Sequence, residues 1–268
     1  MPLIPSPRHT APDLAHWRRL DAYDRRLAGS ERLAARAAQA VDAIREFAAA
    51  GPCYVGASWG KDSVVVAHMA RLADPAIPIV WVRVEPIENP DCALVRDAFL
   101  ARFPGAYDEI VTHCSWDGAQ WVRPETKHRH AAGAQTSGAG FEIAAGRYGD
   151  RYVSGVRGEE SGGREMRMRS LGVSTTRTCA PIGWWSGVEV FAYLSRHDLP
   201  VHPAYAMTMG GALDRIRVRV ASLGGERGTG RGRREWERAY YRSEMEAIAR
   251  GPLEAAALAA APTAEPTP

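Results

Sequence analysis

Hydrophobic residues along this chain recur with two spacings, and stretches of the two kinds alternate. Apolar side chains at helical spacing, such as Leu33 and Ile44, follow Ser30, which can cap a helix, and stop before Gly51. Short apolar runs rich in β-branched residues predict buried strands. The strands are expected over 53–57, 77–84, 109–112 and 151–156, and the helices over 30–47, 63–72, 89–103 and 186–194. Strands that alternate with helices predict an α/β protein with a parallel sheet, whose ligands bind at the carboxyl ends of the strands.

The composition narrows the class of protein. The 268 residues fit one enlarged domain, and 46% hydrophobic with 24% charged residues is typical of soluble globular proteins. No apolar run approaches the ~18 residues of a membrane span, and the N-terminal segment 1–8 lacks the apolar core of a signal peptide. The four cysteines are far apart, without a C-x-x-C pair, which argues against a zinc site or a disulfide framework. We therefore expect a cytoplasmic protein without membrane contact.

One loop carries most of the chemical prediction. Residues 58–63, S-W-G-K-D-S, follow an expected strand and open an expected helix. Gly60 allows a tight turn, and the unpaired amides at the start of the helix favour an anion. Lys61, one of only two lysines among 34 basic residues, can neutralise phosphate, and Ser58 and Ser63 can donate hydroxyls. The pattern predicts a phosphate-binding loop, shorter than a Walker loop. The alternative is an ordinary tight turn with a helix-capping Asp or Ser.

Three segments, in order along the chain, resemble one known family. Residues 58–63 resemble the PP-loop of ATP pyrophosphatases, which usually reads S-G-G-K-D-S. Residues 155–164 resemble the G-x-R-x-x-E-x-x-x-R segment of the PAPS reductase and ATP sulfurylase small-subunit branch. Residues 180–190 and 199–205 resemble the P-[IL]-x-x-W-x-x-x-D-V and [LI]-P-x-x-P-x-Y segments of the same branch. The resemblance implies an adenine nucleotide alpha hydrolase-like domain, with a single Rossmann-like (HUP-type) parallel sheet flanked by helices.

The resemblance also suggests which residues form the site. Arg157 and Arg164 follow the fourth expected strand and can clamp phosphates or sulfate, with Glu160 orienting Arg157 or contributing to a magnesium site; the alternative is a solvated charged run. Asp62 is expected to cap its helix or to position magnesium. The adenine is expected over Val82–Glu85, where relatives commonly have D-T-G. The expected binding set is Ser58, Trp59, Gly60, Lys61, Asp62, Ser63, Val84, Arg157, Glu160 and Arg164, with Lys61, Arg157 and Arg164 as catalytic candidates.

The departures from the family bear on the reaction. Its reductases use a cysteine in a C-terminal E-C-G-x-H motif, whereas this chain has no cysteine after Tyr205. The iron–sulfur versions need paired cysteines, which this chain lacks, so no iron–sulfur cluster is expected. Where many relatives read R-x-G-C beyond the P-x-Y, this chain reads R-I-R-V-R-V over 215–220. Cys179 is interpreted as a buried small residue. We therefore expect binding of ATP with magnesium and cleavage between its α- and β-phosphates, which adenylylates an acceptor in sulfur-related or nucleic-acid modification chemistry.

Two other functions stay open at this stage. One is a sulfonucleotide reductase, acting on PAPS or APS with an external thiol, and the other is a non-catalytic regulator that binds an adenine nucleotide. The Arg-rich segment 215–250 is either a contact for nucleic acid or a solvated helix face. A partner protein or a homo-oligomer also remains open, and the acceptor is unknown.

The remaining segments are assigned by composition. The expected divisions are a helical N-terminal extension over 1–50, the PP-loop nucleotide-binding domain over 51–206, a basic C-terminal segment over 207–250 and a disordered Ala/Pro-rich tail over 251–268. The Gly-rich stretch 117–140 is interpreted as an active-site loop or lid. Within it, His128 and His130 are either metal ligands or ordinary loop residues, and the latter is favoured. Trp184 or Trp185, together with Tyr205, is expected to pack a helix against the sheet.

Overall fold

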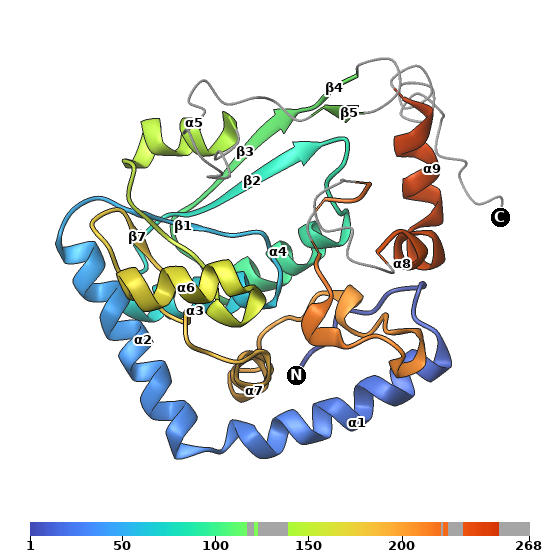
Figure 1. Ribbon diagram of the computed structural model, residues 1–268, viewed down its shortest axis with the longest axis horizontal. Coiled ribbons are helices and arrows are strands. Elements are labelled where there is room, and N and C mark those ends of the chain that lie inside the picture. Colours follow the sequence, from blue (N-terminus) through green and yellow to red (C-terminus); the bar gives the residue numbers. More distant parts are fainter. Residues whose placement is uncertain (117–120, 123–138, 221, 225–232, 252–268) are drawn as a thin grey trace.

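The computed structural model describes residues 1–116, 121–122, 139–220, 222–224 and 233–251. Its centre is a five-stranded sheet in the order β3-β2-β1-β6-β7, and every pair of neighbouring strands is parallel (Figure 1). The strands are β1 (Tyr54–Gly56), β2 (Ile79–Glu85), β3 (Tyr107–His113), β6 (Tyr152–Val153) and β7 (Thr178–Cys179). A separate antiparallel pair is formed by β4 (Ser115–Trp116) and β5 (Trp121–Val122). The parallel sheet confirms the predicted α/β fold class.

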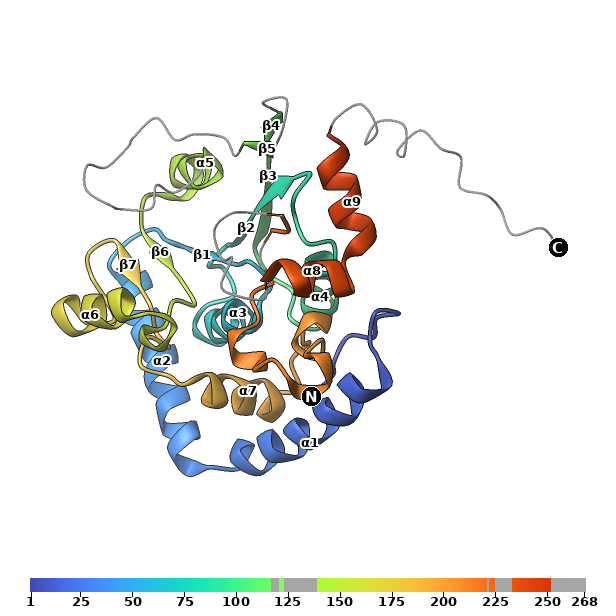
Figure 2. The ribbon, with the colours of Figure 1, turned by 45° about the vertical axis from the view of Figure 1, so that its right-hand side comes forward.

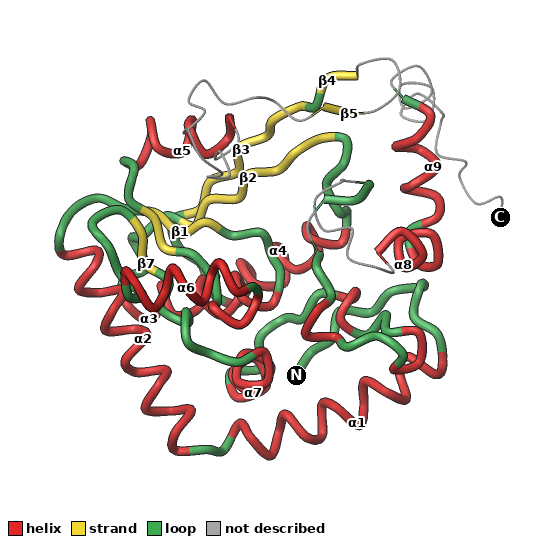
Figure 3. Tube along the Cα trace, viewed as in Figure 1, coloured by secondary structure: helices red, strands yellow, loops and turns green. Residues whose placement is uncertain are grey.

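Helices cover both faces of the sheet (Figures 1 and 3). On one face, α5 packs on β2 and β3, where Tyr54, Val80, Ile110 and Ala144 form a small apolar cluster. The main core lies on the other face, with α3 packed against β1, α2 and α7, and α1 against α7. The helices are α1 (Ala11–Ala28), α2 (Glu31–Ala49), α3 (Lys61–Ala73), α4 (Asp91–Arg102), α5 (Ala139–Tyr148), α6 (Gly162–Leu171), α7 (Gly187–Arg196), α8 (Arg233–Tyr240) and α9 (Arg242–Arg250).

Polar caps set the helix boundaries that the sequence signals. The Ser30 side chain accepts the N–H of Leu33 at the start of α2, and Ser186 forms a capping box with Glu189 at the start of α7. The expected strand over 151–156 is shorter than its apolar run, because the chain leaves the sheet after Val153. Capping residues therefore predicted the starts of these helices more accurately than apolar runs predicted the end of this strand.

The segments at the two ends of the described chain pack together. Asp13 of α1 accepts the N–H of Thr208 at 3.1 Å and the hydroxyl of Tyr240 at 2.9 Å. Arg215 is 5% exposed and donates to the fully buried Asp24 at 2.6 Å. Arg215 is thus part of the interior.

Several expectations concern residues outside the described chain. These are most of the stretch 117–140, with His128 and His130, the residues 225–232 of the basic segment, and the tail 252–268. Among the helices that the structure describes, none is long and apolar enough to cross a membrane.

Candidate functional site

The loop between β1 and α3 turns around two serines and a glycine. β1 ends at Gly56, and α3 begins at Lys61 with Gly60 as its N-cap, at the carboxyl end of β1 (Figure 1). The Ser63 hydroxyl donates to the carbonyl of Gly60 at 3.0 Å and accepts the N–H of Ser58 at 3.2 Å. The Ser63 hydroxyl therefore holds the loop closed, whereas the side chain of Ser58 is exposed.

Trp59 occupies a position where the PP-loop commonly has glycine, and its backbone keeps a glycine-like φ of 56°. A side chain in this left-handed region costs roughly 1–2 kcal/mol. The indole is fully buried, with its ring centroid 5.6 Å from that of Phe99 and 6.5 Å from that of Trp81. Burial of a large apolar side chain contributes roughly 1.5–3 kcal/mol, which offsets the strain. Trp59 is therefore a core residue, and only its main chain remains for the binding role expected from the sequence.

Lys61 and Arg157 meet on one carboxylate. Nζ of Lys61 lies 2.8 Å from Oδ2 of Asp62, and Nε of Arg157 lies 2.6 Å from Oδ1. Arg157 also forms an ion pair with Glu159. The side chains of Lys61 and Arg157 are 5% and 1% exposed, so both cations are held away from bulk water. Burial opposes the charge of the guanidinium, but the carboxylates of Asp62 and Glu159 outweigh this effect and raise the pKa of Arg157.

Two side chains from later in the sequence cover the loop. The Tyr205 hydroxyl accepts the backbone N–H of Lys61 at 2.9 Å, and the Tyr205 ring lies 5.5 Å from Nζ of Lys61. A Cβ atom on Gly60 would come within 3.1 Å of that hydroxyl and 3.0 Å of Cγ2 of Val220. Tyr205, expected only to pack a helix, thus also contacts the loop. The sequence signal for Tyr205 was its position in the [LI]-P-x-x-P-x-Y segment. That segment does not reveal which group the Tyr205 hydroxyl bonds to.

A glycine brings the segment after β6 against the start of α3. A Cβ atom on Gly155 would lie 2.8 Å from the carbonyl carbon of Asp62 and 3.0 Å from the amide nitrogen of Ser63. Both are main-chain atoms, which cannot give way as the end of a flexible side chain can. A larger residue at 155 would therefore push Arg157 away from Asp62. Gly155 belongs to the G-x-R-x-x-E-x-x-x-R segment, but no role in the site was expected of it from the sequence.

Arg164 lies beside this cluster and not in it. Its guanidinium pairs with Glu160, which also accepts the backbone N–H of Arg157 at 3.1 Å. The Arg164 side chain is 34% exposed. The structure thus brings two of the three catalytic candidates, Lys61 and Arg157, onto one carboxylate, and connects Arg164 to them through Glu160.

The turn from Trp184 to Gly187 holds the Arg157–Glu159 pair in place. The carbonyl of Trp185 accepts from Nη1 of Arg157 at 3.2 Å, and the N–H of Gly187 donates to Glu159 at 2.6 Å. Trp185 is buried, as expected of a packing residue, whereas Trp184 is 48% exposed. The position of the guanidinium therefore depends on the main chain of this turn.

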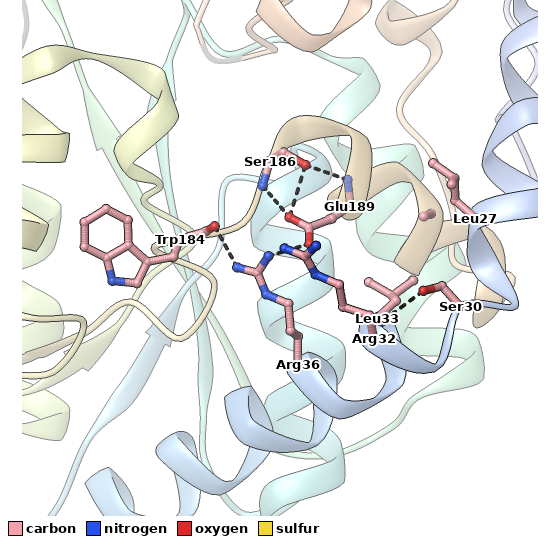
Figure 4. A pocket seen from close by; sticks show the side chains of 9 residues that line it. Leu27, Ser30, Arg32, Leu33, Arg36, Trp184, Ser186 and Glu189 are labelled. Atoms are coloured by element: carbon pink, nitrogen blue, oxygen red, sulfur yellow. Dashed lines mark hydrogen bonds and ion pairs between the residues drawn. The ribbon is translucent and has the colours of Figure 1, made fainter.

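Arg36 of α2 fixes the same turn, beside a cavity of about 470 Å³ (Figure 4). It donates to the carbonyl of Trp184 at 2.7 Å and pairs with Glu189, which accepts the N–H of Ser186 at 2.8 Å. Figure 4 shows the Arg36 guanidinium directed at that carbonyl, with the Trp184 indole turned away. α2 is thus linked through this turn to Arg157 and Glu159.

The position expected for adenine adjoins the loop. β2, which carries Val84, is the neighbour of β1 in the sheet, so its carboxyl end lies at the same edge as the loop. The N–H of Val84 donates to Glu88 at 3.2 Å, and a cavity of about 390 Å³ lined by Glu85 and Asn89 opens beside this end of the strand. None of the described contacts joins Val84 to Lys61.

The cysteines and acids of the described chain bear on cofactors. All four cysteines are free and buried, and burial raises the pKa of the fully buried Cys179 to about 12. Within the described residues, no group of three His, Cys, Asp or Glu side chains could hold a metal ion. Both carboxylate oxygens of Asp62 contact cations of the chain itself, so Asp62 as placed does not fit the magnesium ligand expected of it.

Comparisons with known proteins found a match to a family model and a match to a solved structure. The family model of the phosphoadenosine phosphosulfate reductase domain matches residues 52–231. Among solved structures, the chain is similar to the phosphoadenylyl-sulfate (PAPS) reductase from Candida auris, solved as a phosphate complex. The identity is 11%, the match covers 69% of this chain and 88% of that chain, and the TM-score is 0.39, which says nothing of what this chain binds. No curated protein sequence matches the chain.

Proposed function

The chain belongs to the phosphoadenosine phosphosulfate reductase domain family, and we propose that it binds an adenine nucleotide by its phosphates at the loop 58–63. The observation that carries the proposal is the convergence of Lys61 and Arg157 on Asp62 at the start of α3. Two buried cations at a helix N-terminus form an environment that favours a polyphosphate. Asp62 and Glu159 balance the two cations when no ligand is bound, and a phosphate can take over the hydrogen bonds that Lys61 and Arg157 make to Asp62.

The reaction we propose is cleavage of ATP between the α- and β-phosphates. A nucleophilic atom of the acceptor bonds to the α-phosphorus, and the bond from that phosphorus to the bridging oxygen breaks. Pyrophosphate leaves with the electron pair, and the acceptor carries the adenylyl group. Lys61 and the amides that open α3 stabilise charge on the departing pyrophosphate, and Arg157 holds the remaining phosphate. Magnesium enters as part of the nucleotide substrate, since Asp62 is occupied by Lys61 and Arg157.

A second candidate, reduction of a sulfonucleotide by an external thiol, is favoured by the family to which the chain belongs. It needs a thiol from another molecule, because the four cysteines of this chain are buried. Burial raises the pKa of Cys179, and it raises the pKa of Cys92 well above its usual range, so neither forms a thiolate readily. ATP cleavage is preferred because it uses the loop and needs no thiol.

The test is pyrophosphate release from magnesium–ATP by the wild type and by Lys61→Ala. Arg45→Ala, which removes an exposed arginine of α2 paired with Asp42, is the control. We expect release by the wild type and the control, and loss of most of it in Lys61→Ala. Thiol-dependent sulfite release from PAPS or APS, without pyrophosphate release from ATP, would favour the second candidate. Tight ATP binding without turnover would reduce the proposal to a nucleotide-binding regulator.

A further inference from the structure

Five exposed arginines near the C-terminal end of the described chain have no acidic partner among the described residues. No ion pair within the described residues involves any of them, whereas Arg233 and Arg250 of the same region pair with Glu237 and Glu246. We call the five the arginine ridge. Its members are Arg217, Arg219, Arg234, Arg238 and Arg242.

The first part of the ridge adjoins the loop 58–63. Val218 and Val220 are buried, and the alternating residues Arg217 and Arg219 are exposed. Cγ2 of Val220 lies so close to Gly60 that a Cβ there would be 3.0 Å away. Successive residues of an extended chain advance by roughly 3.3 Å, so Arg219 and Arg217 lie within about 10 Å of this contact along the main chain.

The second part of the ridge lies on α8 and at the start of α9. Arg234 and Arg238 are four positions apart on α8, on a face opposite the buried Trp236 and Tyr240. Arg233 donates to the carbonyl of Arg219, which joins α8 to the first part. Figure 2 shows α8 beside this segment. The ridge therefore continues from the loop onto α8.

The chemistry of this surface fits a phosphate backbone better than a protein. None of the large hydrophobic side chains exposed in the described chain comes from 215–220 or 233–251. Protein interfaces depend on aromatic and apolar anchors, which this surface lacks. Nucleic acids are bound mainly through arginine and lysine contacts to regularly spaced phosphates. A row of guanidinium groups that form no ion pair with another described residue supplies such contacts.

We propose that the arginine ridge binds nucleic acid and that nucleic acid is the acceptor of the adenylyl group. The role of nucleic acid as the acceptor rests on the proposed function. The ridge would lay the strand along α8 and across residues 217–219, so that one nucleotide lies beside the loop where the α-phosphate of ATP is attacked. The chain of contacts from Val220 to Gly60 places the two binding sites side by side.

The test is fluorescence anisotropy of labelled 20-nucleotide single strands and duplexes at a series of salt concentrations. The variant Arg217→Gln/Arg219→Gln is compared with the control Arg18→Gln/Arg26→Gln, which removes two exposed arginines of α1 and the same charge. We expect the wild type and the control to bind, and the ridge variant to bind about tenfold more weakly at 0.1 M salt. The slope of log K against log salt should fall by about 1.5 for the two lost contacts.

Equal weakening by the two double variants would overturn the proposal, because net charge alone would then explain binding. Binding of polyglutamate as tight as that of the oligonucleotide would overturn it as well, since it would point to an acidic protein partner. Lys61→Ala separates the two proposals: it should lose ATP and keep the oligonucleotide. If the ridge variant loses oligonucleotide binding but binds ATP as the wild type does, the result supports the arginine ridge, whatever reaction the loop performs.

Discussion

The hydroxyl of Tyr205 accepts the backbone N–H of Lys61 at 2.9 Å. This N–H opens α3 and is one of the donors that a bound phosphate would use. Burial, and then the charge of Asp62, raise the pKa of Tyr205 well above its usual range, so the phenol stays neutral. The amide can serve the phenol or a phosphate oxygen, but each only at the cost of the other.

Tyr205→Phe should therefore separate stability from binding. The buried N–H of Lys61 loses its partner, which lowers the free energy of unfolding by about 1–3 kcal/mol. ATP affinity should be equal to the wild type or higher, since no hydroxyl competes for the amide. Chemical unfolding and calorimetry measure the two quantities. A variant that is less stable and also binds ATP more weakly would show that Tyr205 supports the bound state.

Arg36→Gln should weaken ATP binding although Arg36 does not touch the loop. Arg36 holds the carbonyl of Trp184, and the following residues hold Arg157 and Glu159. We expect a several-fold loss of affinity, which titration calorimetry can measure. Arg45→Gln removes another α2 arginine, bonded to the carbonyl of Leu72, and should cost similar stability without a change in affinity. Equal affinities in the two variants would rule out a positioning role for Arg36.

The native protein should have no fast-reacting thiol. Cys92 and Cys179 are fully buried, and desolvation disfavours their thiolates and raises both pKa values. A chromogenic disulfide reagent should react slowly with the folded protein at pH 8 and then titrate the four cysteines after unfolding. A rapid burst of one thiol in the folded state would reopen a reductase that uses its own cysteine.

Stability should fall with acid because His202 is fully buried. Burial, and then the charge of Arg8, lower its pKa to about 3, so the folded protein favours the neutral imidazole of His202. The unfolded chain takes up this proton below about pH 6.5, so the contribution of His202 is complete above that pH and declines down to about pH 3. The full loss is on the order of 5 kcal/mol.

The variant His202→Asn tests this assignment. Its amide oxygen can replace Nδ1, which accepts the N–H of Ala204 at 3.1 Å, and it does not titrate. The dependence of unfolding free energy on pH between 6.5 and about 3 should flatten relative to the wild type. His113→Asn, at an exposed position of β3, should keep the wild-type slope. Identical slopes in all three proteins would assign the acid sensitivity to other groups.

Local patterns in the sequence were sufficient for the loop and for four of the five strands of the sheet, whereas the two-residue strand β7 was not predicted. The apolar runs marked β1, β2, β3 and β6, and the capping residues Ser30 and Ser186 marked the starts of α2 and α7. Helix α1 was not located individually, since its apolar face is narrow and its buried positions include Asp13, Asp21 and Asp24. Asp13 and Asp24 have partners far along the chain, Thr208 and Arg215, which local sequence patterns do not reveal.

The candidate site shows the same division. The sequence was sufficient to recognise the loop from its residue types. It did not predict that Tyr205 and Val220 cover the loop, because both lie more than a hundred positions away in sequence. The sequence also gave no sign that Trp59 would turn inward, since that depends on a space between Phe99 and Trp81. Tertiary contacts of this kind are not encoded in local spacing.

The central claim is that phosphates of an adenine nucleotide bind where Lys61 opens α3. The most direct measurement is calorimetric titration of ATP into the wild type, Lys61→Ala and Arg45→Ala under identical salt. The account predicts binding to the wild type and Arg45→Ala, and an affinity about 10- to 100-fold lower in Lys61→Ala, as expected for loss of a charged hydrogen bond. Equal affinities in all three proteins, or no binding of ATP, PAPS or APS to the wild type, would contradict it.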